Sequence, residues 1–173
     1  MKKIAFALVA GLSLAGSAFA GKEMKDFKQP PVEPCFKDQE LQLDVFASYT
    51  STQGGGYSDG FGGGLAVNYF FMRHLGVGVD GNVFDGDQNG VWDATARLIA
   101  RFPLELGSVC LAPYLFAGGG FEADGTTVGT GHVGGGLEWR ATPSFGVFSE
   151  GRYTWAGGPN DAAQVRLGVR FVF

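Results

Sequence analysis

The sequence has few charged residues, few cysteines and few long apolar runs. Charged residues make up 17% of the 173-residue chain, against roughly 25% in an average soluble domain. The formal net charge of −4 provides no basic surface, which argues against nucleic acid as a partner. Two cysteines are too few for a disulfide-dense scaffold or a cysteine-rich zinc module. We therefore expect no cofactor and no metal site.

Glycine and aromatic residues are abundant by contrast. The chain has 30 glycines, about 17% of its residues against roughly 7% on average, and 14% of its residues are aromatic. Disordered chains are poor in aromatic residues, so this composition predicts a folded chain. The length suits one domain with a sizeable core.

The first twenty residues have the features of a secretory signal peptide. Lys2 and Lys3 precede the apolar run IAFALVAGLSLAG, and Ala18 and Ala20 supply small residues at the two cleavage positions. The run is shorter than the roughly 20 residues that a membrane-spanning helix prefers. We predict that residues 1–20 are a signal peptide and that cleavage follows Ala20.

Residues 21–39 differ in composition from everything after them. They are rich in lysine, glutamate and proline, and proline has no backbone N–H to donate to a sheet. We predict an extended N-terminal segment over residues 21–39 and one folded domain over residues 40–173.

From residue 41 onward, apolar and polar residues alternate, as in LQLDV at 41–45. Alternation is typical of strands rather than helices. It recurs in eight segments, of which 109–121 is apolar on both faces. The breakers are alternately polar and glycine-rich, at 51–60, 85–90, 122–131 and 156–161, and short, at 72–74, 103–108 and 141–144. The pattern predicts an all-β fold, an eight-stranded antiparallel up-and-down β-barrel.

The two faces of the strands distinguish a soluble, lipocalin-like barrel from a transmembrane barrel, which has the opposite polarity. One face of nearly every strand is apolar, and its aromatic residues gather near the two strand ends, as in girdles at membrane–water interfaces. Strand lengths of about 9–11 residues also suit a tilted crossing of a bilayer. We therefore favour a transmembrane barrel, with the lipocalin-like barrel as an alternative. The girdle residues are Tyr49, Phe61, Trp92, Tyr153 and Trp155 at the looped end, and Tyr69, Phe71, Phe102, Trp139, Phe145 and Phe171 at the tight-turn end.

The other face carries charges in the middle of the strands, which places them in the lumen. An eight-stranded barrel is only wide enough for side chains to fill, and an unpaired buried charge costs several kcal/mol. Arginine suits such a site because it pairs bidentately with carboxylates. We predict a lumen plugged by ion pairs among Asp44, Asp80, Asp93, Arg97, Arg101, Glu138, Arg140, Glu150, Arg152, Arg166 and Arg170.

Residues 41–173 resemble the small eight-stranded outer-membrane barrels of the OmpA/OmpX type. The most specific element is the C-terminal VRLGVRFVF, and PYLFAGGGF (113–121) and FSEGRYTW (148–155) are similar to the family's fifth and seventh strands. The resemblance implies export to a Gram-negative-type outer membrane, with contacts to outer-membrane lipid. It also implies that the assembly machinery reads the C-terminal strand, with Phe173 as the signal. We expect a monomer, with residues 21–39 and both chain ends on the periplasmic side.

The function that fits this pattern is that of a non-enzymatic outer-membrane protein, with a role in envelope integrity or surface contact. The alternatives are a narrow passive porin and an outer-membrane enzyme that modifies lipid A or cleaves peptides. A catalytic site needs a nucleophile beside an oriented base. The sequence pattern does not bring such a pair of residues together. Of the two histidines, His74 lies in a tight turn, and His132 has no Ser or Asp two residues away. We expect His132 to be a rim residue hydrogen-bonded to loop backbone.

The two cysteines, Cys35 and Cys110, are predicted at the same end of the barrel. The periplasm is oxidising, so this proximity favours a disulfide, with two free thiols as the alternative. The bond would close a loop of about 75 residues and stabilise the fold by about 4 kcal/mol in the chain-entropy model. It would also hold the N-terminal segment across the periplasmic mouth as a lid.

Overall fold

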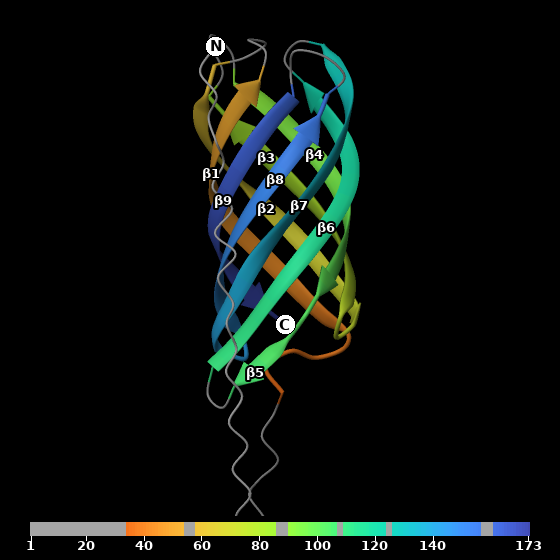
Figure 1. Cartoon of the computed structure of the whole chain (residues 1–173), viewed down its shortest axis with the longest axis vertical. Helices are drawn as coiled ribbons and strands as arrows, with labels where there is room; N and C mark the ends of the chain where they lie inside the picture. Colours follow the sequence, from red (N-terminus) through yellow and green to blue (C-terminus); the bar gives the residue numbers. More distant parts are fainter. Residues whose placement is uncertain (1–33, 54–57, 86–89, 107–108, 124–125, 157–160) are drawn as a thin grey trace, which may run out of the picture. The chain divides into compact units, whose positions relative to one another are not determined.

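The computed structural model describes residues 34–53, 58–85, 90–106, 109–123, 126–156 and 161–173. It confirms the predicted fold: eight long antiparallel strands form a closed up-and-down β-barrel (Figure 1). The strands of the barrel are β1 (Glu40–Gln53), β2 (Gly60–Met72), β3 (Leu75–Phe84), β4 (Val91–Arg101), β6 (Val109–Ala123), β7 (Thr127–Thr142), β8 (Phe145–Trp155) and β9 (Asp161–Val172). A ninth, short strand, β5 (Leu104–Leu106), forms a hairpin with the start of β6.

Helices long and apolar enough to cross a membrane are absent from the described part of the chain. The predicted signal peptide (1–20) and most of the segment 21–39 lie outside the described residues. So do positions 54–57, 86–89, 124–125 and 157–160 of the predicted loops and 107–108 of a predicted turn.

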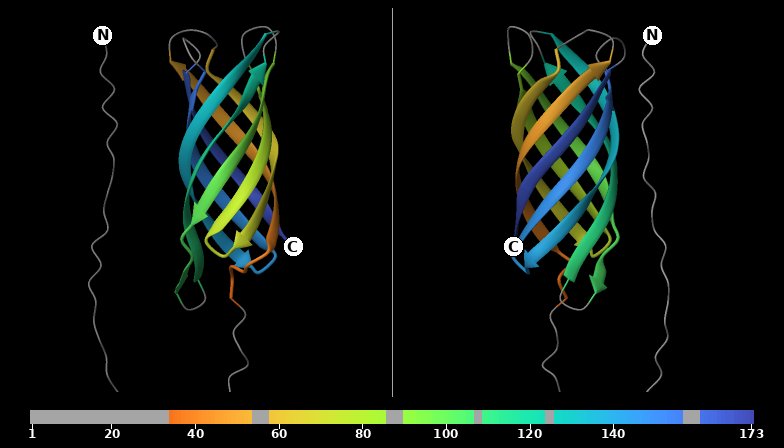
Figure 2. Two further views of the ribbon diagram at one scale, coloured as in Figure 1. Left: turned by 90° about the vertical axis from the view of Figure 1, so that its right-hand side faces the viewer. Right: turned by 60° about the vertical axis from the view of Figure 1, so that its left-hand side comes forward.

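The barrel closes through two strand pairs that the chain does not connect by a simple turn. Strand β1 pairs with β9 from Gln42↔Val172 to Gln53↔Asp161, and β4 pairs with β6 over ten positions from Trp92↔Ala123 to Arg101↔Tyr114. Closure leaves none of the eight long strands at an edge, which removes the exposed hydrogen-bonding groups that promote aggregation. Figure 2 shows the resulting tilt and right-handed winding of the strands.

The two ends of the barrel differ. At the turn end, two residues join β2 to β3 (Arg73 and His74) and β7 to β8 (Pro143 and Ser144). The first described residues, β5 and the C-terminal Phe173 also lie at this end (Figures 1 and 2). We call the opposite end the loop end. There the chain passes from β1 to β2, from β3 to β4, from β6 to β7 and from β8 to β9.

Two sequence predictions about lengths need correction. Strands β3, β4 and β8 have the predicted 9–11 residues, but the other five barrel strands have 12 to 16. Most of the predicted loop 122–131 is also strand, because β6 continues to Ala123 and β7 begins at Thr127. Its glycines do not break the strand, since Gly129 and Gly131 pair in register with Phe121 and Gly119. A hairpin can continue in this way beyond the apolar band, since its polar side chains are solvated.

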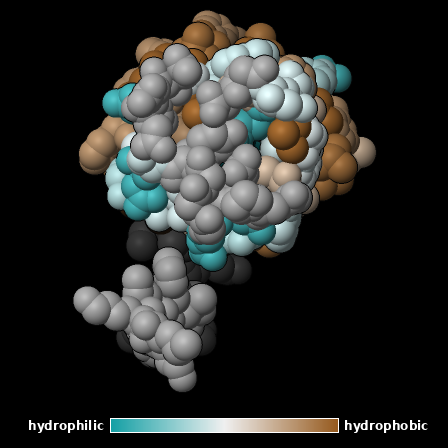
Figure 3. All heavy atoms as spheres, turned by 90° about the horizontal axis from the view of Figure 1, so that it is seen from above, coloured by the Kyte–Doolittle hydropathy of each residue, from teal (hydrophilic) through white to brown (hydrophobic). Residues whose placement is uncertain are grey.

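Burial alternates along most of each long strand, except at glycine-rich stretches such as 62–64 and 134–136, so inward and outward faces can be distinguished. In β3, for example, each outward residue is exposed and each inward one is buried. The outward face is apolar: leucine, valine and aromatic side chains on all eight strands are between 37% and 77% exposed. The view from the loop end shows hydrophobic residues over much of the visible flank (Figure 3).

Inward-facing glycines make room for aromatic rings. Each of six inward rings lies directly opposite a glycine on the next strand: Phe46↔Gly64, Phe70↔Gly76, Phe84↔Gly62, Tyr114↔Gly136, Phe116↔Gly134 and Phe148↔Gly168. A Cβ atom at Gly134 would lie 2.4 Å from Cζ of Phe116, and one at Gly136 would lie 2.6 Å from Tyr114 Cζ. The high glycine content therefore serves a packing requirement as well as strand curvature.

This packing predicts that Gly134→Ala destabilises the barrel by about 1–3 kcal/mol, because the added methyl group would lie 2.3 Å from the carbonyl oxygen of Gly151 and 2.4 Å from Cζ of Phe116. The outward-facing Gly151 is the matched control, since a Cβ there meets nothing within 4 Å. Gly151→Ala is expected to change the free energy of unfolding by less than about 0.5 kcal/mol. Denaturant unfolding of the refolded protein, followed by gel mobility, measures both values. Equal losses in the two variants would contradict the packing argument.

Candidate functional site in the barrel lumen

The structure places all eleven predicted lumen residues on the inner face of the barrel. None is more than 6% exposed, and Asp44, Arg101 and Glu138 are fully buried. Together with Glu40, which the sequence analysis did not include, they form six carboxylates and six arginines, each in at least one ion pair. They divide into two clusters of three carboxylates and three arginines each.

The first, which we call the loop-end cluster, comprises Asp80, Asp93, Glu150, Arg97, Arg152 and Arg166. Arg97 Nη1 lies 3.1 and 3.0 Å from the two carboxylate oxygens of Glu150. Arg152 spans two carboxylates, at 3.2 Å from Asp80 and 3.1 Å from Asp93. Arg166 contacts Asp80 at 3.0 Å and Glu150 at 3.3 Å. Every charge in this cluster therefore has an opposite charge as its neighbour.

The second, which we call the turn-end cluster, comprises Glu40, Asp44, Glu138, Arg101, Arg140 and Arg170. Arg170 forms a bidentate ion pair with Asp44, in which Nε donates to Oδ1 at 2.7 Å and Nη2 to Oδ2 at 2.6 Å. Its Nη1 atom lies 2.6 Å from Oε2 of Glu138. Arg140 contacts Glu138 at 2.7 Å and also pairs with Glu40. Arg101 completes the cluster at 2.8 Å from Glu40.

Glu40 was missed because it stands at the boundary between the proline-rich segment and the first strand. The alternation of the strand could have predicted its place, since Glu40, Gln42 and Asp44 are two residues apart and lie on the same face of β1. Glu40 accepts hydrogen bonds from two arginines on the strands that flank β6, Arg101 on β4 and Arg140 on β7.

Aromatic rings fill the lumen among the charges, which the sequence analysis did not predict. Phe70, Ile99, Tyr114 and Phe116 form one apolar cluster, and Phe46, Ala66 and Phe148 form another. Guanidinium groups lie over these rings, for example Arg101 at 3.8 Å from the ring centre of Phe70. Such stacking strengthens a dehydrated arginine contact.

Two side chains connect the clusters. Asn68 donates to Asp44 at 2.8 Å and accepts from Arg97 at 3.1 Å. The Tyr114 hydroxyl donates to Glu150 at 3.0 Å, while its ring faces the Arg170 guanidinium at 5.6 Å. A cavity of about 10 Å³ near the loop end, lined by Thr50, Asp93, Thr130 and Arg152 among others, has room for about one water molecule.

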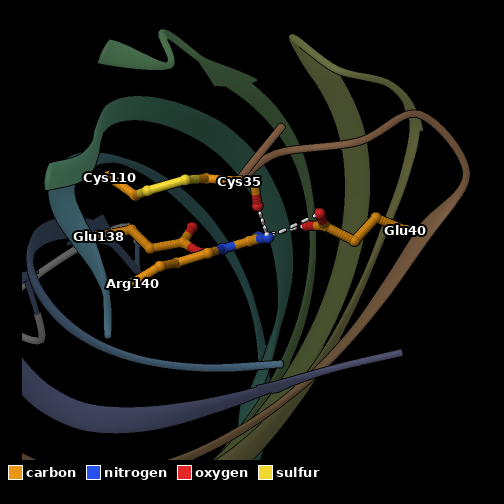
Figure 4. Close-up of a disulfide and its surroundings, with 5 residues drawn as sticks. All are labelled: Cys35, Glu40, Cys110, Glu138 and Arg140. Carbon is orange, nitrogen blue, oxygen red and sulfur yellow. Dashed lines mark hydrogen bonds and ion pairs between the residues drawn. A yellow bond between two sulfur atoms is a disulfide. The ribbon is translucent and has the colours of Figure 1, made fainter. Parts of the chain in front are cut away.

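The predicted disulfide is present between Cys35 and Cys110, whose Cα atoms are 6.0 Å apart. It brings the next residue, Phe36, into the turn-end mouth, where its side chain is fully buried against Cys110 and Ala112. Arg140 lies beside it and donates to the carbonyl oxygen of Cys35, as well as pairing with Glu40 and Glu138 (Figure 4). Phe36 was also missed, because a lone aromatic residue in a polar, proline-rich stretch carries no periodic signal.

The expectation for His132 was wrong. It is not a rim residue bonded to loop backbone: it is 2% exposed inside the barrel, with its ring centre 6.0 Å from that of Phe116. His132 lies on the inward-facing side of β7, as Glu138 and Arg140 do. Neither ring nitrogen has a hydrogen-bond partner among the described residues, so none of these residues orients His132 as a base. Within the same residues, no cluster of three or more His, Cys, Asp or Glu is arranged to hold a metal ion.

The predicted girdle residues all point outward. Nine of the eleven are exposed, and Tyr153 and Phe145 are half-buried by neighbouring rings, Trp155 at 5.2 Å and Phe171 at 5.7 Å. Phe121, which was not predicted, packs edge-on against Trp92 at 5.5 Å. The side chain of Phe173 is 75% exposed, while its backbone pairs with that of Leu41.

Neither a protein-family model nor a curated protein sequence matches the chain. Solved structures do share its fold. The N-terminal β-barrel domain of OprF from Pseudomonas aeruginosa has a TM-score of 0.63 and 16% identity, over 79% of this chain and 98% of that one. Ail, the attachment invasion locus protein of Yersinia pestis, has a TM-score of 0.55 and 19% identity, over 79% and 99%. Neisserial surface protein A has a TM-score of 0.55 and 19% identity, over 76% and 95%. The chain therefore has the fold of the small eight-stranded outer-membrane barrels.

The separation into two clusters predicts how lumen substitutions combine. Glu150→Gln and Arg97→Met each remove one partner of a buried pair, and each is expected to destabilise the barrel by about 3–5 kcal/mol. The double variant should lose about 1–3 kcal/mol less than the sum, since the two residues contact each other.

The matched control combines Glu150→Gln with Glu40→Gln, which belongs to the other cluster. These losses should add to within about 0.5 kcal/mol. Denaturant unfolding in detergent or lipid measures the three single and the two double variants. Strong coupling between Glu40 and Glu150 would show that the lumen is one cooperative network instead of two.

Proposed function

We propose that this protein is a non-enzymatic integral outer-membrane barrel with a closed lumen, exported by a signal peptide that is cleaved after Ala20. Its role is structural, in envelope integrity and in surface contact at the loop end. The observation that carries the proposal is the polarity of the barrel: charges paired inside and an apolar surface bounded by aromatic residues outside. This is the polarity of a transmembrane barrel and the inverse of a soluble one.

A closed lumen is supported by what fills it. The two clusters place six arginines and six carboxylates in pairs across the barrel, and aromatic rings occupy the space between them. The Phe36 ring and the disulfide lie across the turn-end mouth. A passive porin needs a continuous water-filled path, and these side chains obstruct one at several levels.

The non-enzymatic proposal rests on the buried charges themselves. Their carboxylates are neutralised by arginine neighbours on the inside of the barrel, away from any lipid or peptide at its surface. General acid–base catalysis needs a group within hydrogen-bond reach of the substrate. The lumen side chains have no such access.

The location is tested by fractionation of cells that express the full chain. We expect the protein in the outer-membrane fraction, with a faster gel mobility before boiling than after. Protease added to intact cells should cut at the loop end, within 51–60, 85–90, 122–131 or 156–161, if it cuts at all. Recovery as a soluble periplasmic protein would refute the membrane location, and cleavage at 103–108 in intact cells would show the opposite orientation.

Conductance tests the closed lumen separately. Folded wild-type protein in planar bilayers should show no stable, large single-channel conductance, because the paired side chains fill the barrel. A variant with Arg97→Ala and Glu150→Ala removes a buried ion pair of the loop-end cluster, whose Arg97 Nη1 and Glu150 Oε2 atoms are 3.0 Å apart. Openings that appear only in this variant would support the proposal. Stable conductance of the wild type would favour the narrow porin instead.

A further inference from the structure

Residues Cys35–Glu40, which we call the N-terminal plug, cross the turn-end mouth of the barrel. Glu40 begins β1, whereas Cys35 is bonded to Cys110 on β6, which is not adjacent to β1 in the sheet. The chain turns at Gln39, whose φ of 54° is the only left-handed value at a non-glycine residue among those described. This turn lets Phe36 enter the mouth while Glu40 joins the strand.

The plug is attached to four separate elements. Phe36 lies between two guanidinium groups, 4.8 Å from that of Arg101 on β4 and 4.3 Å from that of Arg140 on β7. Arg140 donates to the carbonyl oxygen of Cys35, and the backbone N–H of Arg73 in the β2–β3 turn donates to Asp38. The disulfide to β6 is the one covalent attachment (Figure 4).

Cys35 is partly buried, so it is the more accessible of the two bonded cysteines. A pocket of about 340 Å³ is lined by Cys35, Lys37, Arg140 and the C-terminal residues Val172 and Phe173. Cys110 is only 9% exposed and packs against Phe36 and Ala112. Thiol–disulfide exchange needs access of a thiolate to one sulfur, and nearby Lys and Arg side chains favour the anionic thiolate.

We propose that the Cys35–Cys110 disulfide is a redox-sensitive latch: a dithiol reductant opens it, Phe36 leaves its site between Arg101 and Arg140, and the barrel stays folded. The reductant's thiolate attacks the Cys35 sulfur, and Cys110 leaves as a thiolate that takes up a proton. The second thiol of the reductant then displaces Cys35, which is also protonated. The reductant ends as a disulfide, having supplied both electrons and both protons.

Release follows from the loss of the covalent attachment. The remaining contacts of the plug must then offset the conformational entropy of ordering Cys35–Gln39. The barrel itself does not depend on the bond, because it closes through the β1–β9 and β4–β6 pairs. The vacated mouth would expose Arg101 and Arg140, which Phe36 now covers.

The latch is tested on the full chain folded in detergent micelles or nanodiscs. Dithiothreitol is added without denaturant, alkylation and mass spectrometry report the thiols, and chymotrypsin reports Phe36, since it cleaves after an accessible phenylalanine. We expect both cysteines to become alkylated and the rate of cleavage after Phe36 to rise roughly tenfold or more, as the released state is populated. Cleavage after Phe46 or Phe70, inside the strands, should stay negligible.

The matched control is the double variant Cys35→Ser and Cys110→Ser, which should be cleaved rapidly after Phe36 with or without dithiothreitol. Three results would overturn the proposal: a disulfide that resists reduction until the barrel unfolds, unchanged protection of Phe36 once the bond is cut, or loss of the folded gel mobility on reduction. None of these depends on membrane location or conductance, so this test can fail while the proposed function stands, and the reverse.

Discussion

The structure depends on the burial of charge inside a barrel that has too little room for water to solvate that charge. Eight strands enclose an interior that side chains fill, and removing a single charge partner there costs several kcal/mol. Each carboxylate in the two clusters therefore has an arginine within reach, and most arginines contact two carboxylates. Because a strand slipped by one residue would turn its charges outward, this pairing also specifies the register of the sheet.

Volume imposes a second constraint, and glycine meets it. Arginines and aromatic rings fill most of a narrow lumen, so an inward ring needs a small residue beside it on at least one neighbouring strand. The rings of Phe46, Tyr114 and Phe148 each lie over a glycine on a neighbouring strand, and arginines stack on the rings. Glycine weakens an isolated strand, yet here each inward glycine permits a ring contact that a larger residue would block. The high glycine content of the sequence therefore follows in part from the packing of aromatic rings in the lumen.

Much of the fold and of the lumen could be predicted from the sequence, because successive residues of a strand face opposite sides of the sheet. Alternation was sufficient for the strand number, the inward charges and the outward aromatic residues. It failed where the period is absent or interrupted. Phe36 lies in a stretch with no repeat, Glu40 is the first residue of its strand, and 109–121 is apolar on both faces. The lengths of β6 and β7 failed for a different reason, since glycine marks a turn in one context and a strand residue opposite a partner backbone in another.

The plug and the ion-pair clusters meet at Arg101 and Arg140 but perform separable tasks. Both arginines hold Glu40 through charge and Phe36 through ring contacts. If Phe36 leaves, the arginines keep their carboxylates, so the turn-end cluster remains neutral and the loop-end cluster is untouched. The closed lumen that we propose is therefore a property of the strands, whose inward charges are paired. The plug adds a covalent cover to the turn-end mouth alone, where a change in redox state can act without unfolding the barrel.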